Sequence, residues 1–185
     1  ALLLSLLPLE DLFFGQIDIW LHLLKILKYI LDNCHSWIWF CLFTVTGTMI
    51  QILAGEKGQG KTKKLIDMAN EASKTVDGNV VFIDDDSRHM YDLHYGIRFV
   101  ETSKYKICSY EVLIGFIYGI LSQNGDIQKV FIDGLGNIVN ELPDDDVVAL
   151  CEVLERISND YSVDFALIYS KPEASVPEAV KKYLI

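Results

Sequence analysis

The sequence predicts an α/β domain with three layers, in which helices cover both faces of a mainly parallel sheet of about five strands. Two observations predict this class. From Met49 onward, short apolar runs alternate with segments of helical periodicity. Some of these runs, such as residues 79–83, are continuously apolar, which is typical of strands buried on both faces. Because strands that alternate with helices form parallel sheets, we expect a mainly parallel arrangement.

The first half of this region predicts three strands and one helix. Residues 49–54 (MIQILA) form the first expected strand, and residues 61–74 form a helix with one apolar face. After the turn VDGN, residues 79–83 predict a second strand, and residues 97–100 predict a weaker third. The helix residues expected to face the core are Leu65, Ile66, Met68, Ala69 and Ala72.

The second half predicts two more strands and three helices. Ser109 is a suitable cap for a helix that runs to about residue 122, where QNGD ends it. Residues 129–133 (KVFID) predict a buried strand, and residues 144–160 a helix with three acids in its first turn, where the helix dipole favours them. Residues 164–170 predict the last strand, and residues 176–183 a short closing helix.

A domain boundary is expected near Met49, which separates an apolar segment, residues 1–48, from a domain that covers residues 49–185. Within residues 17–32 the polar side chains recur every three or four positions, which predicts a helix that contacts a membrane or a partner. The alternative is that residues 1–48 are an extension, a fragment or a translated upstream region. A spanning helix is not expected, because the uncharged residues 37–48 are too few to cross ~30 Å of hydrocarbon.

Charge and cysteine content indicate which partners and which cellular compartment to expect. The net charge of −10 makes nucleic acid an unlikely partner, since phosphate backbones are bound by basic surfaces. The four cysteines include no CxxC pair, so neither a zinc knuckle nor a disulfide framework is indicated. The sequence therefore predicts a cytoplasmic protein, or a membrane-associated one if residues 1–48 are native.

A glycine-rich loop is the strongest functional signal. Residues 55–62 (GEKGQGKT) match G-x-x-x-x-G-K-[ST], and a predicted strand and helix flank the loop as the motif requires. The glycines let successive backbone N–H groups converge on phosphate oxygens, and the helix N-terminus favours anions. We expect Lys61 to reach the β- and γ-phosphates and the Thr62 hydroxyl to ligate Mg²⁺. The alternative is a lysine-rich turn. The residues expected to bind nucleotide are Gly55, Glu56, Lys57, Gly58, Gln59, Gly60, Lys61 and Thr62.

A second motif ends the strand KVFID. Asp133 resembles the Walker B aspartate, which holds a magnesium-bound water, so Thr62 and Asp133 are the expected metal ligands and Lys61 and Asp133 the expected catalytic residues. Gly134 occupies the place where many motor ATPases carry a water-activating glutamate. DGLG (133–136) resembles the DxxG of GTPase-like families, and YSKPE (169–173) resembles their guanine-reading motif imperfectly. GTP therefore stays open as an alternative to ATP.

The third signal is the stretch IDDDSRH. Asp84, Asp85 and Asp86 follow the second strand, and ligands of open α/β sheets bind at the carboxyl ends of strands. One of the three could act as the general base of a small-molecule kinase. The alternative is that they form a polar strand end, with Arg88 and Arg98 either neutralising them or contacting phosphate.

Together these motifs resemble the P-loop NTPases over residues 49–185. The stretches GEKGQGKTKKLIDMANEA, VVFIDDDSRHMYDLHYGIRFV and FIDGL resemble more narrowly a group of small bacterial P-loop ATP-binding proteins, sometimes labelled twitching-motility ATPases. The resemblance implies the P-loop fold and an ATP-binding protein with weak Mg²⁺-dependent ATPase activity. Such a protein would act as a switch or assembly component, activated by a protein partner or by a second copy of itself.

Overall fold

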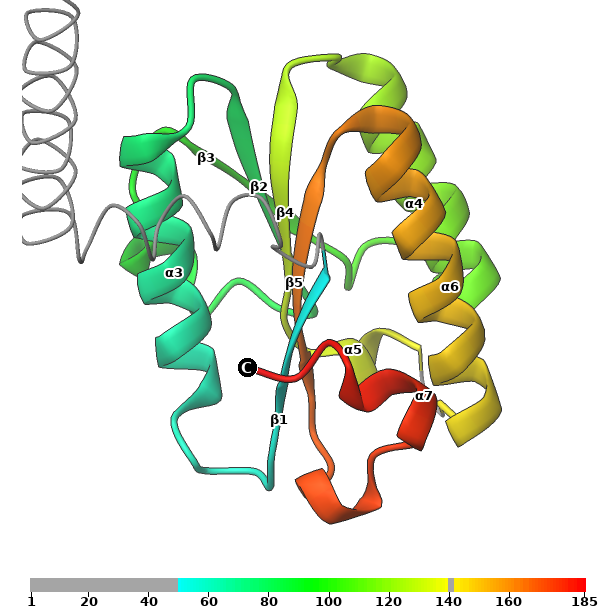
Figure 1. The fold of residues 1–185 in the computed structure, drawn as a ribbon. Coiled ribbons are helices and arrows are strands. Elements are labelled where there is room, and N and C mark those ends of the chain that lie inside the picture. The colour runs from blue at the N-terminus through cyan, green and yellow to red at the C-terminus, as the bar shows by residue number, and fades with distance from the viewer. Residues whose placement is uncertain (1–49, 140–141) are drawn as a thin grey trace, which may run out of the picture. The chain divides into compact units, whose positions relative to one another are not determined.

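The computed structural model describes residues 50–139 and 142–185. One sheet organises this part of the chain (Figure 1), and all its strands are parallel, in the order β1-β5-β4-β2-β3. The predicted α/β class with a mainly parallel sheet is therefore confirmed. The strands are β1 (Ile50–Ala54), β2 (Asn79–Asp84), β3 (Ile97–Glu101), β4 (Ile127–Ile132) and β5 (Asp164–Tyr169).

Helices cover both faces of the sheet, which gives the three predicted layers. On one face lies α3 (Lys61–Thr75). The other face carries α4 (Tyr110–Gln123), α5 (Leu135–Ile138), α6 (Asp144–Tyr161) and α7 (Glu178–Lys181). Two short 3₁₀ turns, η1 (Met90–Asp92) and η2 (Glu173–Ser175), complete the described elements.

The sheet separates two apolar cores, and β2 shows how. Val81 and Ile83 pack toward α4 and α6, whereas Val80 and Phe82 pack toward α3. This alternation leaves the run fully buried, as its continuous apolar sequence predicts. Four of the α3 residues expected in the core are buried, and Met68 is partly buried at its edge.

The signals predicted at the starts of α4 and α6 are confirmed. The Ser109 hydroxyl accepts a hydrogen bond from the backbone N–H of Val112 at 3.4 Å, which caps α4. The first turn of α6 carries its three acids, Asp144, Asp145 and Asp146. Ser162, with φ of 56°, ends α6 in the left-handed conformation.

The predicted closing helix over residues 176–183 is wrong in extent. The α7 helix covers only Glu178–Lys181, because Val176 precedes Pro177 and is held extended, with φ −75° and ψ 131°. Beyond α7 the chain runs along the outer edge of β1. There the Ile52 N–H donates to the Tyr183 carbonyl at 2.8 Å, and Leu184 forms a parallel bridge with Ile52.

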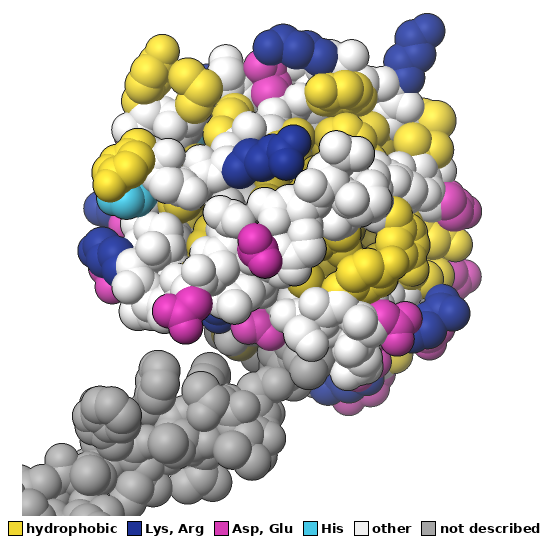
Figure 2. Space-filling model, turned by 90° about the horizontal axis from the view of Figure 1, so that it is seen from above, with side chains coloured by type: hydrophobic (Ala, Val, Ile, Leu, Met, Phe, Trp, Pro, Cys, Tyr) yellow, Lys and Arg dark blue, Asp and Glu magenta, His cyan; other side chains and the backbone are white. Residues whose placement is uncertain are grey.

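The expected boundary at Met49 and the amphipathic helix over residues 17–32 lie outside the described residues. Within the part that is described, no helix is both long and apolar enough to cross a bilayer. Figure 2 views the end of the domain where the strands begin. On this face lysine and arginine side chains stand apart from one another among acidic and apolar ones, so no continuous basic surface forms there.

Candidate functional site

The glycine loop joins β1 to α3 at the edge of the sheet where the strands end (Figure 1). Three of its residues have positive φ: Gly55 at 145°, Gly58 at 88° and Gly60 at 76°. Side chains with a Cβ rarely adopt these angles, so each of the three positions favours glycine. Gly60 in the left-handed conformation directly precedes the first residue of α3, Lys61. The loop backbone is thus folded in a way that glycine makes possible.

The loop presents a row of free donors. None of the backbone N–H groups of residues 56–63 donates to an acceptor among the described residues, and the first helical bond of α3 is from Lys64 N–H to the Gly60 carbonyl at 3.1 Å. The loop is anchored at its start, where Gly55 N–H donates to the Lys171 carbonyl at 2.8 Å. Lys61 Nζ donates to the Glu56 carbonyl at 2.6 Å, which keeps the ammonium over the loop. Unpaired N–H groups, a helix N-terminus and a lysine are the groups that can hold an anion.

The sheet register places Asp133 and Asp84 at the same edge as this loop. Ile132 is level with Leu167 of β5, which is level with Ile52 of β1. Asp133, one residue further, is therefore about two strand spacings, roughly 10 Å, from β1. On its other side Ile132 pairs with Ile83, so Asp84 lies level with Asp133 and about 4.8 Å away across the sheet.

Both carboxylates lie on the α3 side of the sheet. Side chains alternate along a strand, and Phe82 and Phe131, two residues before Asp84 and Asp133, belong to the core under α3. The chain leaves β2 toward the α3 face and leaves β4 toward the opposite face. The strand order reverses between these two strands, which is where open α/β sheets bind ligands.

Asp84 is the most perturbed acid of the site. Its side chain is only 3% exposed, and burial, reinforced by the charge of Asp133, raises its pKa from 3.8 to about 7. Its Oδ1 accepts the Asp85 N–H at 2.8 Å, but its Oδ2 has no hydrogen-bond partner among the described residues. Asp133 is also buried, and its Oδ1 accepts the Gly134 N–H at 2.6 Å.

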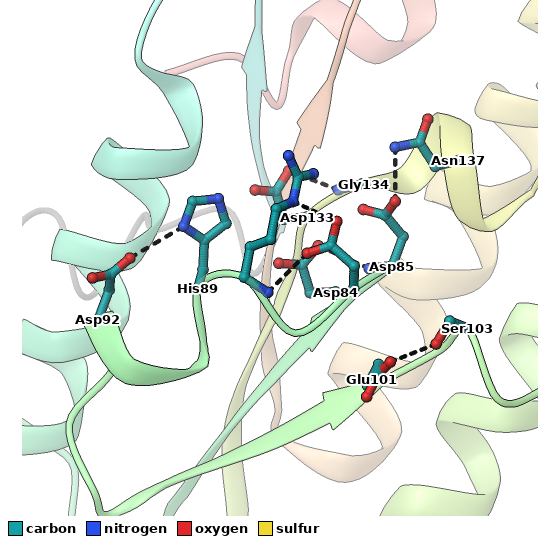
Figure 3. A network of polar contacts seen from close by, with 11 residues as sticks. Asp84, Asp85, His89, Asp92, Glu101, Ser103, Asp133, Gly134 and Asn137 are labelled. Atoms are coloured by element: carbon teal, nitrogen blue, oxygen red, sulfur yellow. Dashed lines mark hydrogen bonds and ion pairs between the residues drawn. The ribbon is translucent and has the colours of Figure 1, made fainter.

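Asp85 points away from this pair toward α5 (Figure 3). Its Oδ2 accepts a hydrogen bond from the Asn137 side chain at 2.9 Å. Gly134 has φ of 64°, and a Cβ at that position would collide with the Asp85 carboxylate. The left-handed backbone and the nearby Asp85 carboxylate both favour glycine after Asp133. Neither α5 nor the Asn137 contact was predicted from sequence.

Replacing Gly134 should destabilise the fold. For Gly134→Glu and Gly134→Ala we expect a loss of about 2 kcal/mol or more in the free energy of unfolding, because left-handed strain and the collision with Asp85 add together. Urea unfolding monitored by circular dichroism measures it. Gly136→Glu is the matched control, because a Cβ there meets nothing within 4 Å. Equal stability of Gly134→Glu and Gly136→Glu would contradict the packing role.

The third aspartate, Asp86, is neutralised locally. It accepts hydrogen bonds from the backbone N–H of Arg88 at 2.9 Å and from its Nε at 2.6 Å, and these contacts lower the pKa of Asp86. Of the two roles considered for Arg88, the structure shows the neutralising one. Arg98 is exposed on β3. Of the three aspartates, Asp84 is buried, Asp85 is bound by Asn137 of α5, and Asp86 is paired with Arg88.

A cavity of about 530 Å³ opens beside the start of α3. Asn70 joins its two sides, because its amide donates to the Asp92 carbonyl at 3.0 Å and its Oδ1 accepts the His94 N–H at 2.7 Å. His89 Nδ1 lies 3.1 Å from the Asp92 carboxylate, as Figure 3 shows. The cavity is lined by Thr62, Lys63, Ile66, Asp67, Asn70, His89 and Asp92.

The structure brings most of the predicted site to one edge of the sheet. The loop after β5 lies beside the glycine loop, since the Lys171 carbonyl binds Gly55, while Lys171 Nζ pairs with Asp144 at 2.7 Å. Within residues 50–139 and 142–185, no group of three or more His, Cys, Asp or Glu side chains is arranged to hold a metal. A magnesium ion here would take water, and phosphate when a nucleotide is bound, as its further ligands, since Mg²⁺ usually keeps several waters in its shell.

Comparison with known proteins adds no family: no protein-family model and no curated protein matches the chain.

Proposed function

We propose that residues 50–185 form a P-loop domain that binds a nucleoside triphosphate, ATP in the first place, together with Mg²⁺. The observation that carries this proposal is the loop 55–62, with its three positive-φ glycines and its row of unpaired N–H donors. An anion-binding loop of this shape, ending in lysine and threonine at a helix N-terminus, fits a triphosphate.

Each residue of the loop takes a defined part in this binding. The N–H groups of residues 56–63 would donate to phosphate oxygens. The Lys61 ammonium, which now donates to the Glu56 carbonyl, would donate to the phosphates instead. The Thr62 hydroxyl would ligate Mg²⁺, and Asp133 would hold a water of its shell. The bound metal supplies charge neutralisation at the phosphates.

Hydrolysis by the isolated protein should be slow, well under about one turnover per second. Gly134 carries no carboxylate, and the Arg88 guanidinium is engaged by Asp86. A protein partner or a second copy is therefore the expected source of an accelerating residue. This supports a switch or assembly component rather than a motor.

A small-molecule kinase is the second candidate, and the cavity beside Thr62 favours it. Its volume of about 530 Å³ lies in the range of small-ligand sites. A base from Asp84, Asp85 or Asp86 was predicted for this activity, and Asp84 is the one whose pKa is raised toward neutrality, by burial above all. GTP in place of ATP is tested by the same titrations as ATP.

Thr62 provides the test of the metal-dependent part. Thr62→Ala should weaken ATP binding about tenfold in the presence of Mg²⁺ and little in EDTA, because only the metal ligand is lost. Thr62→Ser, which keeps the hydroxyl, should bind like the wild type. Titration calorimetry with ATP and with GTP, with and without Mg²⁺, measures this. An equal loss with and without Mg²⁺ would contradict the assignment of the hydroxyl to the metal.

A further inference from the structure

The carboxylate pair, Asp84 and Asp133, lies at the carboxyl ends of adjacent strands, β2 and β4, at the point where the strand order reverses. The two residues are level in the register and share the α3 side of the sheet. Their exposed fractions are 3% and 7%, so both acids are more than nine-tenths buried. Two buried carboxylates whose backbones are one strand spacing apart, about 4.8 Å, repel one another unless something positive lies between them.

The described residues supply no positive partner for the pair. The nearby Arg88 is held by Asp86 at 2.6 Å, and Lys61 is held by the Glu56 carbonyl. Each acid accepts one backbone N–H, and the Oδ2 of Asp84 accepts nothing among the described residues. A buried carboxylate oxygen without a donor is costly, so a partner from outside the chain is indicated.

Hydrogen bonds to its backbone fix the position of Asp84. Thr102 donates both its N–H, at 2.8 Å, and its hydroxyl, at 2.9 Å, to the Asp84 carbonyl. On the other side of Asp84, Glu101 is its register partner on β3. Glu101 is satisfied by Ser103 at 2.6 Å and Lys104 at 3.0 Å, and stands apart with Ser103 in Figure 3. Of the three acids at this edge, Glu101 has side-chain partners of its own, whereas Asp84 and Asp133 each accept only one backbone N–H.

We propose that Asp84 and Asp133 form a divalent-cation site, in which Asp84 is a second carboxylate that holds Mg²⁺ before the nucleotide arrives. The ligands are hard oxygens, which suit Mg²⁺ and Mn²⁺. Two carboxylates suffice, because Mg²⁺ keeps several waters in its shell. The inference deepens the proposed function, since it rests on the role given there to Asp133 and adds a residue with no assigned part in metal binding.

The test uses the full chain at pH 8 with Mn²⁺ alone and no nucleotide. Free Mn²⁺, followed by electron paramagnetic resonance, should fall as the protein is added, and Mg²⁺ should release the bound ion. Asp84→Asn and Asp133→Asn should each weaken Mn²⁺ binding by about tenfold or more. Glu101→Gln is the matched control, because it removes a carboxylate one strand away that already has its own partners, and it should leave binding nearly unchanged.

Three results would overturn the inference: no Mn²⁺ binding by the wild type, equal binding by Asp84→Asn and wild type, or an equal loss in Glu101→Gln. An equal loss in Glu101→Gln would show that Mn²⁺ binds to a diffuse acidic surface rather than to the pair. Circular dichroism checks the fold of each variant. If Asp133→Asn does not fold, the Mn²⁺ affinity of Asp84→Asn decides the test. Lys61→Ala separates the two proposals, since it should keep Mn²⁺ binding while losing ATP. A wild type that binds ATP but no Mn²⁺ would refute only the cation site.

Discussion

Lys61→Ala should lower the affinity for ATP by about 100-fold or more, with little change in the stability of the fold. Its ammonium would donate charge-assisted hydrogen bonds to two phosphates, and each such bond contributes about 1.5–3 kcal/mol. A loss of 1.4 kcal/mol is a factor of ten in affinity, so two bonds account for the expected change.

The same substitution should be harmless to the fold because Lys61 makes one exposed contact, with the Glu56 carbonyl, and packs in neither core. Titration calorimetry gives the affinity, and urea unfolding gives the stability. Lys64→Ala is the control, since this lysine is exposed on the same helix three residues on and should bind ATP as the wild type does. Equal ATP affinity for Lys61→Ala and the wild type would refute the phosphate-cradle interpretation.

Local patterns predicted those parts of the fold that depend on nearest neighbours in the chain. The apolar run of β2 is buried on both faces because alternate residues pack against different cores. Helix α3 begins at Lys61, because Gly60 in the left-handed conformation directly precedes it. Ser109 caps α4 because its hydroxyl reaches an N–H three residues away. These arrangements are decided within a few residues, so the sequence displays them.

Arrangements between distant segments were not predictable in the same way. Nothing local indicates that β1 lies beside β5, or that residues 183–185 run along the open edge of β1. The neighbourhood of Asp84 and Asp133 follows from the strand order, which motif spacing does not reveal. Gly134 looked like a missing catalytic residue, whereas its position is restricted by the carboxylate of Asp85, which follows strand β2.

Asp84→Asn should make the protein more stable than the wild type at pH 8 and nearly equal to it at pH 4. In the folded protein burial, and then the charge of Asp133, raise the pKa of Asp84 to about 7 from an ordinary value of 3.8. The neighbouring charged groups are Asp133, just after β4, and Asp85 and Arg88, just after β2. The charges of Asp133 and Asp85 oppose ionisation of Asp84, whereas Arg88 carries the opposite charge but is engaged by Asp86. Unfolding returns Asp84 to water, where it ionises readily.

The sign of the pH dependence follows from this comparison. Between pH 4 and 7 the folded state keeps a proton on Asp84 that the unfolded state has released, so the free energy of unfolding falls as the pH rises. The contribution of Asp84 is complete below pH 3.8 and is lost above pH 7, and the full change is about 4 kcal/mol at most. An asparagine does not ionise, so the variant should lack this part of the decline.

Urea unfolding in EDTA at pH 4, 6 and 8 measures the effect without a divalent cation. The advantage of Asp84→Asn over the wild type should be small at pH 4 and grow to several kcal/mol at pH 8. Asp160→Asn is the control, because Asp160 is an exposed acid near the end of α6. Its free energy of unfolding should fall with rising pH as that of the wild type does. If Asp84→Asn and the wild type lose the same stability between pH 4 and pH 8, Asp84 does not ionise at a cost in the folded protein.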